Sequence, residues 1–389
     1  MSITDMALDP VRSLIIRWGD GDPPPDLLRA LSPNVAIVKN EAELPKRIEG
    51  GLWPGVNRTG NAKRDADEVA SASREPWVNA NGFRIQCHRA AHPNQPALLD
   101  VKPDAKAGLS EGQVVAFESL ELALAEARAN GGNAVLNPDQ RFKDALKAND
   151  AKALAAWKSL ARTAKWLEDN AALFGKPPVP IITSVHNGSD ETEEFANMLF
   201  RRGGTPRIAT PDRLPRPDAQ HILVVSAAGL KELPAALLDH ARAGATLITD
   251  AKPDPSWKKV KPEQDRDFYA LGKGQILGYR EPVLDPSEYA LDVIDVANYR
   301  RRAARIWNAG AAIPLATEGT SANETLLITL NYGSRVDQEV QVRVQGLFSK
   351  ATLLRPESEP VNLKIYKRGT MTEVFLPTLA VVAAVRFLR

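Results

Sequence analysis

A change in the hydrophobic period along the chain constrains its fold more than any other feature. Between residues 13 and 175 the apolar runs are short and continuous: SLIIRW, NVAIVK, GGLWPGV, PALLDV, QVVAFE and NAVLNP. Continuous runs of roughly four to six residues are typical of strands in a parallel sheet that helices cover on both faces. Helical patterns separate the runs, so this part predicts a (β/α) barrel or an open doubly wound sheet.

The number of runs limits the barrel. Six strands are predicted in about 165 residues, whereas a complete eight-stranded barrel needs about 250 residues. We therefore assign residues 1–175 to a shortened (β/α)-barrel-like domain.

A second α/β pattern follows in residues 176–280. The runs VPIITSV, RIAT, HILVVSA and ATLITD alternate with two helical segments, which predicts a flavodoxin-like α/β domain with about four parallel strands. The segment contains neither GxGxxG nor GxxxxGK[ST], so no nucleotide cofactor, and no other cofactor, is expected. Residues 281–318 are predicted to be a connecting segment with one helix, roughly from 289 to 306.

The last part, residues 319–389, has a period of two. Runs such as ETLLITLNY and QEVQVRVQG alternate apolar and polar residues and are separated by turn residues. This pattern predicts a small antiparallel β-sandwich with one solvated face on each sheet. The fold class predicted for the whole chain is therefore α/β plus β.

Charge and composition narrow the possible partners. Among 389 residues, 50 Lys and Arg balance 48 Asp and Glu, so no nucleic-acid partner is expected. No apolar stretch approaches the ~20 residues of a membrane span, so no membrane partner is expected either. The single cysteine excludes an internal disulfide. The N-terminal residues do not have the pattern of a signal peptide, and the localisation stays open between the cytoplasm and export after removal of a signal.

The order of these parts resembles that of a known enzyme superfamily. The segments VPIITSVHNGSDETEEFANMLFRRGGTPRIATPDRLP and LLITLNYGSRVDQEVQVRVQG, with VFLPTLAVVAAVRFL at the end, carry the resemblance. The chain resembles multidomain glycoside hydrolases of the (β/α)-barrel superfamily and is similar in plan to family 42 β-galactosidases. The resemblance implies a barrel, a flavodoxin-like domain, a C-terminal β domain, a carbohydrate substrate or ligand, and a homo-oligomer, either a dimer or a trimer.

The resemblance has one clear departure. It implies a general acid in an Asn-Glu pair after the fourth barrel strand and a second Glu after the seventh. The early pair Asn40-Glu41 follows the second predicted strand instead, and no seventh strand is visible. Two functions therefore stay open: a glycoside hydrolase-like protein acting on an oligo- or polysaccharide, and a catalytically inactive carbohydrate-binding or assembly protein.

Candidate site residues follow from the strand ends, because barrel active sites lie at the carboxyl ends of the strands. Asp100 and Glu118 are the carboxylates that end consecutive apolar runs, and glycoside hydrolysis needs two carboxyl groups. They are the predicted catalytic pair. The alternative is that Asp100 caps the following segment and that Glu118 opposes a helix dipole. Polar side chains and indoles near the same ends are predicted to bind substrate: Arg17, Trp18, Lys39, Trp53, Asn57, Trp77 and Asn137.

Two further groups carry weaker signals. Cys87, His88 and His92 lie close in sequence, but a zinc site needs a third suitably placed ligand, and no metal is predicted. Ser184, His186 and Asp190 would allow a hydrolase centred on the second domain. Because HNGSDE also suits a helix start, with Asn187 or Ser189 as the N-cap, capping is favoured there.

Overall fold

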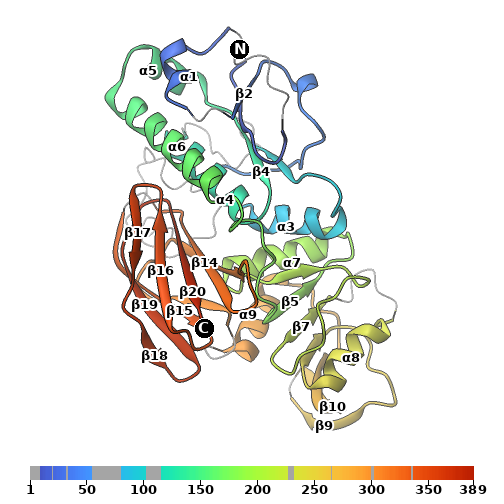
Figure 1. Cartoon of the computed structure of the whole chain (residues 1–389). Coiled ribbons are helices and arrows are strands. Elements are labelled where there is room, and N and C mark those ends of the chain that lie inside the picture. Colours follow the sequence, from blue (N-terminus) through green and yellow to red (C-terminus); the bar gives the residue numbers. More distant parts are fainter. Residues whose placement is uncertain are drawn as a thin grey trace, which may run out of the picture.

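The computed structural model of the chain contains four β-sheets (Figure 1). It describes residues 9–19, 21–31, 34–54, 80–101, 115–226, 232–263, 265–298, 302–333 and 336–389. Within these ranges the chain is α/β in its first two thirds and antiparallel β at its carboxyl end. No helix among them is long and apolar enough to cross a bilayer.

The first sheet, here the N-terminal sheet, has four parallel strands in the order β2-β1-β4-β3. Its strands are β1 (Leu14–Arg17), β2 (Val35–Val38), β3 (Leu98–Asp100) and β4 (Asn133–Leu136). The helical elements between and after them are α1 (Pro25–Arg29), η2 (Glu41–Glu43), α3 (Gly82–Ala91), α4 (Ser119–Ala129), α5 (Gln140–Lys147) and α6 (Ala151–Asp169).

Four of the six predicted strands are therefore confirmed. The described residues of the other two runs, 50–54 and 115–118, are not in strands, and the prediction was wrong for them. Ile48 alone makes a parallel bridge to Leu99 at the edge of the sheet. Trp53 then enters the core, where it is 1% exposed, without joining a strand ladder.

The second sheet, here the central sheet, has seven strands in the order β6-β5-β7-β8-β11-β10-β9. The first five are parallel to one another. Strand β10 pairs antiparallel with β11, and β9 pairs antiparallel with β10. The strands are β5 (Ile182–Val185), β6 (Arg207–Ala209), β7 (Ile222–Val225), β8 (Thr246–Thr249), β9 (Lys258–Pro262), β10 (Arg266–Leu271) and β11 (Gly274–Tyr279), with helices α7 (Asp190–Arg201), α8 (Ala235–Ala243) and α9 (Pro286–Ala297).

The carboxyl-terminal part contains two antiparallel sheets that share one hydrophobic core. The outer sheet, in the order β12-β15-β19-β18, consists of β12 (Ala304–Ile306), β15 (Asp337–Gln345), β19 (Met371–Leu379) and β18 (Tyr366–Arg368). The inner sheet, in the order β13-β14-β20-β16-β17, consists of β13 (Ala312–Glu318), β14 (Glu324–Asn331), β20 (Val382–Leu388), β16 (Lys350–Arg355) and β17 (Ser358–Asn362).

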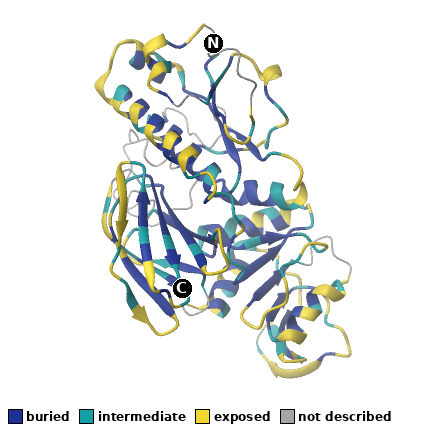
Figure 2. Ribbon diagram, viewed as in Figure 1, coloured by how far each residue is buried: buried dark blue, intermediate teal, exposed yellow. Residues whose placement is uncertain are grey.

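The inner sheet is covered on both faces. Leu327 and Val385 join the core shared with the outer sheet, whereas Leu326 and Ile328 join the core formed with the N-terminal helices. Helix α4 contacts β14 directly. Figure 2 accordingly shows mostly buried residues along β14 and β20. The N-terminal part and the two carboxyl-terminal sheets are thus one packed unit rather than separate bodies joined by a linker.

The N-terminal part also contacts the central sheet. Helix α3 packs on α7 and on β6, with Phe83, Cys87 and Phe200 among the buried side chains between them. The predicted connecting segment 281–318 holds α9, which packs on α7, and then β12 and β13, which pair with strands of the β-sandwich. The helix predicted from 289 to 306 ends at Ala297, and residues 304–306 form β12.

Candidate functional site

The carboxyl edge of the N-terminal sheet brings several predicted residues together. Arg17 is the last residue of β1, Asp100 is the last residue of β3, and Asn137 directly follows β4. Because these strands are parallel and β4 lies between β1 and β3, the three side chains come from adjacent strand ends. Ligands of open α/β sheets bind at this kind of edge.

Asp100 is held on both of its carboxylate oxygens. Its Oδ2 accepts hydrogen bonds from Nη2 of Arg17 at 2.6 Å and is 3.1 Å from Nε of Arg47. Its Oδ1 accepts a hydrogen bond from Nδ2 of Asn137 at 2.9 Å. The Asp100 side chain is only 4% exposed. Asp100 is therefore the centre of a buried ion-pair network that ties three strand ends to the segment before Ile48.

Two polar atoms beside Asp100 have no protein partner among the described residues. They are Nε of Arg17, which is a donor, and Oδ1 of Asn137, which is an acceptor. A small cavity of about 10 Å³ lies between Trp53, Asn137 and Phe142. That volume suits a single water molecule rather than a sugar ring.

Glu118 lies in a different environment. It immediately precedes α4, is exposed, and makes no hydrogen bond from its side chain to the first turn of that helix. A carboxylate at this position still interacts favourably with the positive end of the helix dipole. The predicted catalytic role of Asp100 and Glu118 stays a prediction, with one member buried in ion pairs and the other on the surface.

Two of the three indoles predicted to bind a sugar, Trp18 and Trp53, are core residues. Trp18 and Trp53 are each 1% exposed, and the Trp18 ring meets Trp157 edge-on with centroids 6.1 Å apart. Neither ring therefore offers a face to solvent. Lys39 is exposed and forms an ion pair with Asp22 at 3.0 Å. Asn57 and Trp77 lie outside the residues that the structure describes.

The sequence HNGSDE is confirmed as a helix start. Ser189 is the N-cap of α7, and its Oγ accepts a hydrogen bond from the backbone N–H of Thr192. Nδ1 of His186 is 2.9 Å from Oγ1 of the same threonine. Ser184 is 1% exposed within β5. These residues stabilise a strand–helix junction and form no nucleophile–base pair.

Cys87 is buried, and the nearby residues His88 and His92 lie next to each other. Cys87 is 2% exposed, and desolvation, with a contribution from Glu193, raises the pKa of its thiol. The rings of His88 and His92 lie 5.0 Å apart, and the pKa of His88 is lowered by burial and by the second imidazole. In the described ranges no three His, Cys, Asp or Glu side chains are grouped as metal ligands.

A cavity of about 790 Å³ lies at the opposite, amino edge of the N-terminal sheet, next to β6. Its charged lining includes Arg89 and Arg207. Arg89 donates to the carbonyls of Asn130 and Gly175, and Arg207 donates to the carbonyl of Pro178. Arg89 therefore ties α3 to the end of α4 and to Gly175, whereas Arg207 ties β6 to the segment before β5.

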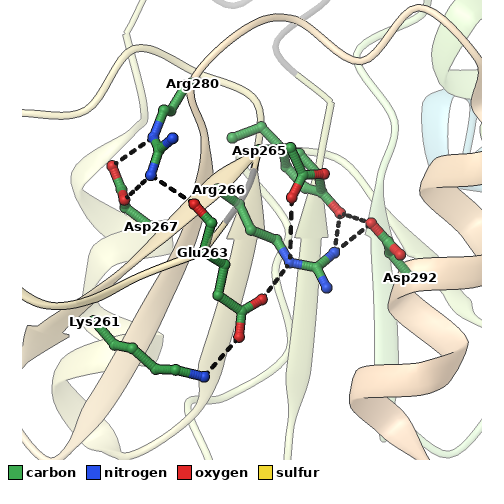
Figure 3. A network of polar contacts seen from close by, with 8 residues as sticks. Lys261, Glu263, Asp265, Arg266, Asp267, Arg280 and Asp292 are labelled. Atoms are coloured by element: carbon green, nitrogen blue, oxygen red, sulfur yellow. Dashed lines mark hydrogen bonds and ion pairs between the residues drawn. The ribbon is translucent and has the colours of Figure 1, made fainter.

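A network of charged residues covers the end of the central sheet (Figure 3). Arg280 makes two hydrogen bonds to Asp267, at 2.7 and 3.2 Å, and Lys259 lies 2.8 Å from the same carboxylate. These contacts, led by the hydrogen bond from Arg280, hold the pKa of Asp267 below its usual range. Arg266 bridges Glu263 and Asp292. With every labelled carboxylate in contact with a cation, this network is a structural ion-pair cluster.

Two important residues escaped the sequence analysis. Arg47, which completes the Asp100 network, lies in a segment without any regular pattern. Glu126 looks like an ordinary surface position of a helix, yet it is 0% exposed. The only sequence signal for Glu126 is its helix, LELALAEARA, which is apolar over most of its circumference and so indicates burial on all sides.

Comparison with known proteins defines the class of fold. The amino-acid sequence matches no protein-family model and no curated protein sequence. Solved structures do match: the fold is that of multidomain glycoside hydrolases, as the resemblance implied. Because the identities are very low, this similarity concerns the fold alone.

Two solved structures illustrate the match. The α-L-fucosidase isoenzyme 2 from Paenibacillus thiaminolyticus has a TM-score of 0.51 at 9% identity, over 93% of this chain and 69% of that chain. A catalytic mutant of Gan42B, a GH42 β-galactosidase from G. stearothermophilus, has a TM-score of 0.50 at 11% identity, over 93% of this chain and 65% of that chain. This chain thus spans less than two thirds of the galactosidase.

Proposed function

We propose that this chain is a carbohydrate-binding protein built on the plan of the multidomain glycoside hydrolases, and that Asp100 stabilises it rather than attacking a glycosidic bond. The engagement of Asp100 by Arg17, Arg47 and Asn137 carries this proposal. A nucleophile or general acid must touch the scissile bond. A carboxylate that is 4% exposed and bonded on both oxygens is poorly placed for that contact.

The strand order supports an incomplete barrel. In a closed (β/α) barrel each strand lies between its sequence neighbours, and the last strand closes on the first. The order β2-β1-β4-β3 has this form if β1 and β2 are the first two strands and β3 and β4 are the last two. Asp100, at the end of β3, then stands at the seventh-strand position. Among the described residues no strand takes the fourth position, where the resemblance implies the general acid.

For the rest of the chain we propose the domain boundaries that the sequence analysis assigned. The order β6-β5-β7-β8-β11 of the central sheet corresponds to 2-1-3-4-5, which is the order of flavodoxin-like sheets. This supports a flavodoxin-like domain in residues 176–280, with a connecting segment 281–318 and a sandwich from 319 to 389.

We include a homo-oligomer, a dimer or a trimer, in the proposal; light scattering on the purified chain tests it.

Hydrolysis by Asp100 and Glu118 is the second candidate. The exposure of Glu118 beside the positive end of α4 favours it, because a carboxylate in that position is open to a substrate. The unpartnered Nε of Arg17 and Oδ1 of Asn137 also suit a hydroxyl group, which both accepts and donates a hydrogen bond.

A turnover assay separates the two candidates. The wild-type chain and Glu118→Gln are assayed on a panel of aryl glycosides, and both are tested for retention by immobilised polysaccharides. We expect retention by at least one polysaccharide and no turnover in either protein. Turnover in the wild type that falls by about a hundredfold or more in Glu118→Gln, with an unchanged circular dichroism spectrum, would establish the hydrolase instead.

A further inference from the structure

The outward face of the outer sheet carries cations and an aromatic ring in one row across four strands. Arg305 of β12 pairs with Arg343 of β15, Arg343 pairs with Glu373 of β19, and Glu373 pairs with Tyr366 of β18. The alternate residues Val342 and Val374 point the other way and are 0% exposed. The row is therefore the solvent side of the sheet.

A second row beside the first adds two exposed rings. Gln341 pairs with Phe375, and the backbone N–H of Trp307 donates to the carbonyl of Gln341 at 3.1 Å. Trp307 is 42% exposed and Phe375 is 41% exposed. Tyr366 meets the Phe375 ring edge-on at 5.7 Å. Since Trp307 and Phe375 flank β15, they are about two strand spacings, or about 10 Å, apart.

Two guanidinium groups lie close to the indole. Cζ of Arg305 lies 3.7 Å from the centroid of the Trp307 ring, and Cζ of Arg343 lies 4.7 Å from it. Such stacking fixes the ring and keeps the two cations close together. Burial, and then the positive charge of Arg343, lower the pKa of Arg305.

The carboxylates on this face leave positive charge uncompensated. Glu373 is 0% exposed and is shared by Arg343 and Arg368, with Nε of Arg368 at 3.1 Å. Lys364 lies over the Tyr366 ring and adds a further cation. Two further carboxylates, Asp337 and Glu339 of β15, lie four and two residues before Gln341. In the part of the chain that the structure describes, Arg305 forms no ion pair.

We propose that this surface, made of Trp307, Phe375, Tyr366, Arg305 and Arg343, binds an acidic polysaccharide. Sugar rings present C–H faces that pack on Trp307 and Phe375, and the amide of Gln341 between those rings meets hydroxyl groups. The guanidinium of Arg305 pairs with a carboxylate or sulfate of the polymer. The inference rests on the proposed carbohydrate-binding function and adds a site and a substrate class to it, away from the N-terminal sheet.

Charge and spacing favour a glycan over a nucleic acid. The cations form one small group beside aromatic rings, whereas the chain as a whole has a net charge of only +2. A nucleic-acid binder normally carries a more extensive basic surface. A single-stranded oligonucleotide is nevertheless the matched competitor, because its bases also stack on aromatic rings.

Affinity electrophoresis of the whole chain tests the site. The gels contain polygalacturonate, dextran sulfate or neutral dextran, and the proteins are wild type, Trp307→Ala, Phe375→Ala and Arg305→Gln. Arg162→Gln is the matched control, because Arg162 is exposed on α6 and donates a hydrogen bond to the nearby Ser159. We expect binding of at least one acidic polymer, weakened about tenfold by Trp307→Ala and by Arg305→Gln and unchanged by the control.

Each of the other outcomes contradicts one part of this proposal. Equal binding by all variants would move the glycan site elsewhere and leave the proposed carbohydrate-binding function standing. Equal retardation by neutral dextran would show that the ligand need not be acidic. Tighter binding of an oligonucleotide than of either acidic polymer would show that the surface binds nucleic acid instead of a polysaccharide. Binding of dextran sulfate but not of polygalacturonate would identify sulfated polysaccharides as the ligand class. The reverse result would identify polysaccharides that contain uronic acids. Failure to bind either acidic polymer would overturn the inference, while the wider polysaccharide panel still decides the proposed function.

Discussion

The carboxylate of Glu126 accepts a hydrogen bond from the hydroxyl of Tyr332 at 2.8 Å, and this contact joins residues 206 positions apart. The same Oε1 accepts the backbone N–H groups of Asn81 and Gly82 at the start of α3. Glu126 therefore ties α4 both to the end of the inner sheet and to another helix. Its burial raises the pKa of the carboxyl above the ordinary value of 4.5.

Tyr332→Phe should destabilise the protein by about 1–2 kcal/mol, because the variant removes one hydrogen bond to a buried acceptor while keeping the ring. Urea unfolding followed by fluorescence measures the change. Tyr366→Phe is the control, since Tyr366 lies on the exposed face of the outer sheet. Equal stability of wild type and Tyr332→Phe would show that the hydroxyl contributes nothing at this interface.

Glu126→Gln should change how stability depends on pH. A raised folded-state pKa means that the stabilisation from the protonated carboxyl is fully present below the unfolded pKa and is lost as pH rises through the folded pKa. The wild type should therefore lose stability relative to Glu126→Gln over the pH range above the ordinary carboxyl pKa of 4.5. Unfolding free energies measured across that range check this, and a constant difference between the two proteins would contradict it.

Asp100→Asn should destabilise the chain by about 1.5–3 kcal/mol, because it removes the buried carboxylate that bonds to the part-buried cations Arg17 and Arg47 and leaves them with the more exposed Glu41. The matched control is Asp26→Asn, which breaks an exposed pair with Arg29 and should cost at most about 1 kcal/mol. Thermal unfolding compares the two variants. Similar small shifts for both would mean that the network is weak and that Asp100 is free to serve another role.

The sequence predicted the elements whose hydrophobic period was unambiguous. The continuous runs around Ile15, Ala36, Leu99 and Val135 became β1 to β4, because parallel strands covered on both faces need apolar residues at every position. The run GGLWPGV failed because Pro54 has no N–H to donate to a ladder. At Gly51 the backbone also runs so close to the Asp100 carbonyl that a Cβ would lie 2.9 Å from it.

The candidate site was predictable only in part. Strand ends placed Arg17, Asp100 and Asn137 at one edge, and the structure brings them together. The sequence could not reveal that Trp18 and Trp53 face the core, because an indole after a strand can pack in the core or lie at the exposed edge of the sheet. The surface around Trp307 was missed because residues 289–306 were expected to form one helix. The alternation of Ala304, Arg305 and Ile306 has the period of a strand, and it is too short to outweigh the helical pattern before it.

Asp267→Asn should reduce the loss of stability in acid. The folded-state pKa of Asp267 is depressed, so its stabilisation is present above the ordinary value of 3.8 and is lost as pH falls through the folded pKa. The acid limb of the wild-type stability curve should therefore be steeper than that of the variant. Asp265→Asn, on a neighbouring and 60% exposed side chain, is the control and should follow the wild type. Parallel acid limbs for wild type and Asp267→Asn would contradict the assignment.

Cys87 should report the opening of the contact between the N-terminal part and the central sheet. It is the only cysteine of the chain, and burial between α3 and α7 raises the pKa of its thiol, so the reactive thiolate is scarce in the folded protein. A thiol reagent at about pH 8 should label the folded chain far more slowly than the chain unfolded in guanidinium chloride.

Two variants separate the causes of that protection. Phe83→Ala removes a ring packed in the same cluster, costs about 3–5 kcal/mol, and should speed labelling strongly. Arg84→Gln breaks the ion pair with Glu193 at 2.6 Å, which is partly exposed, and should speed it only slightly. If the native thiol instead reacts as fast as the unfolded one, α3 does not stay docked on α7, and the N-terminal part moves independently of the central sheet.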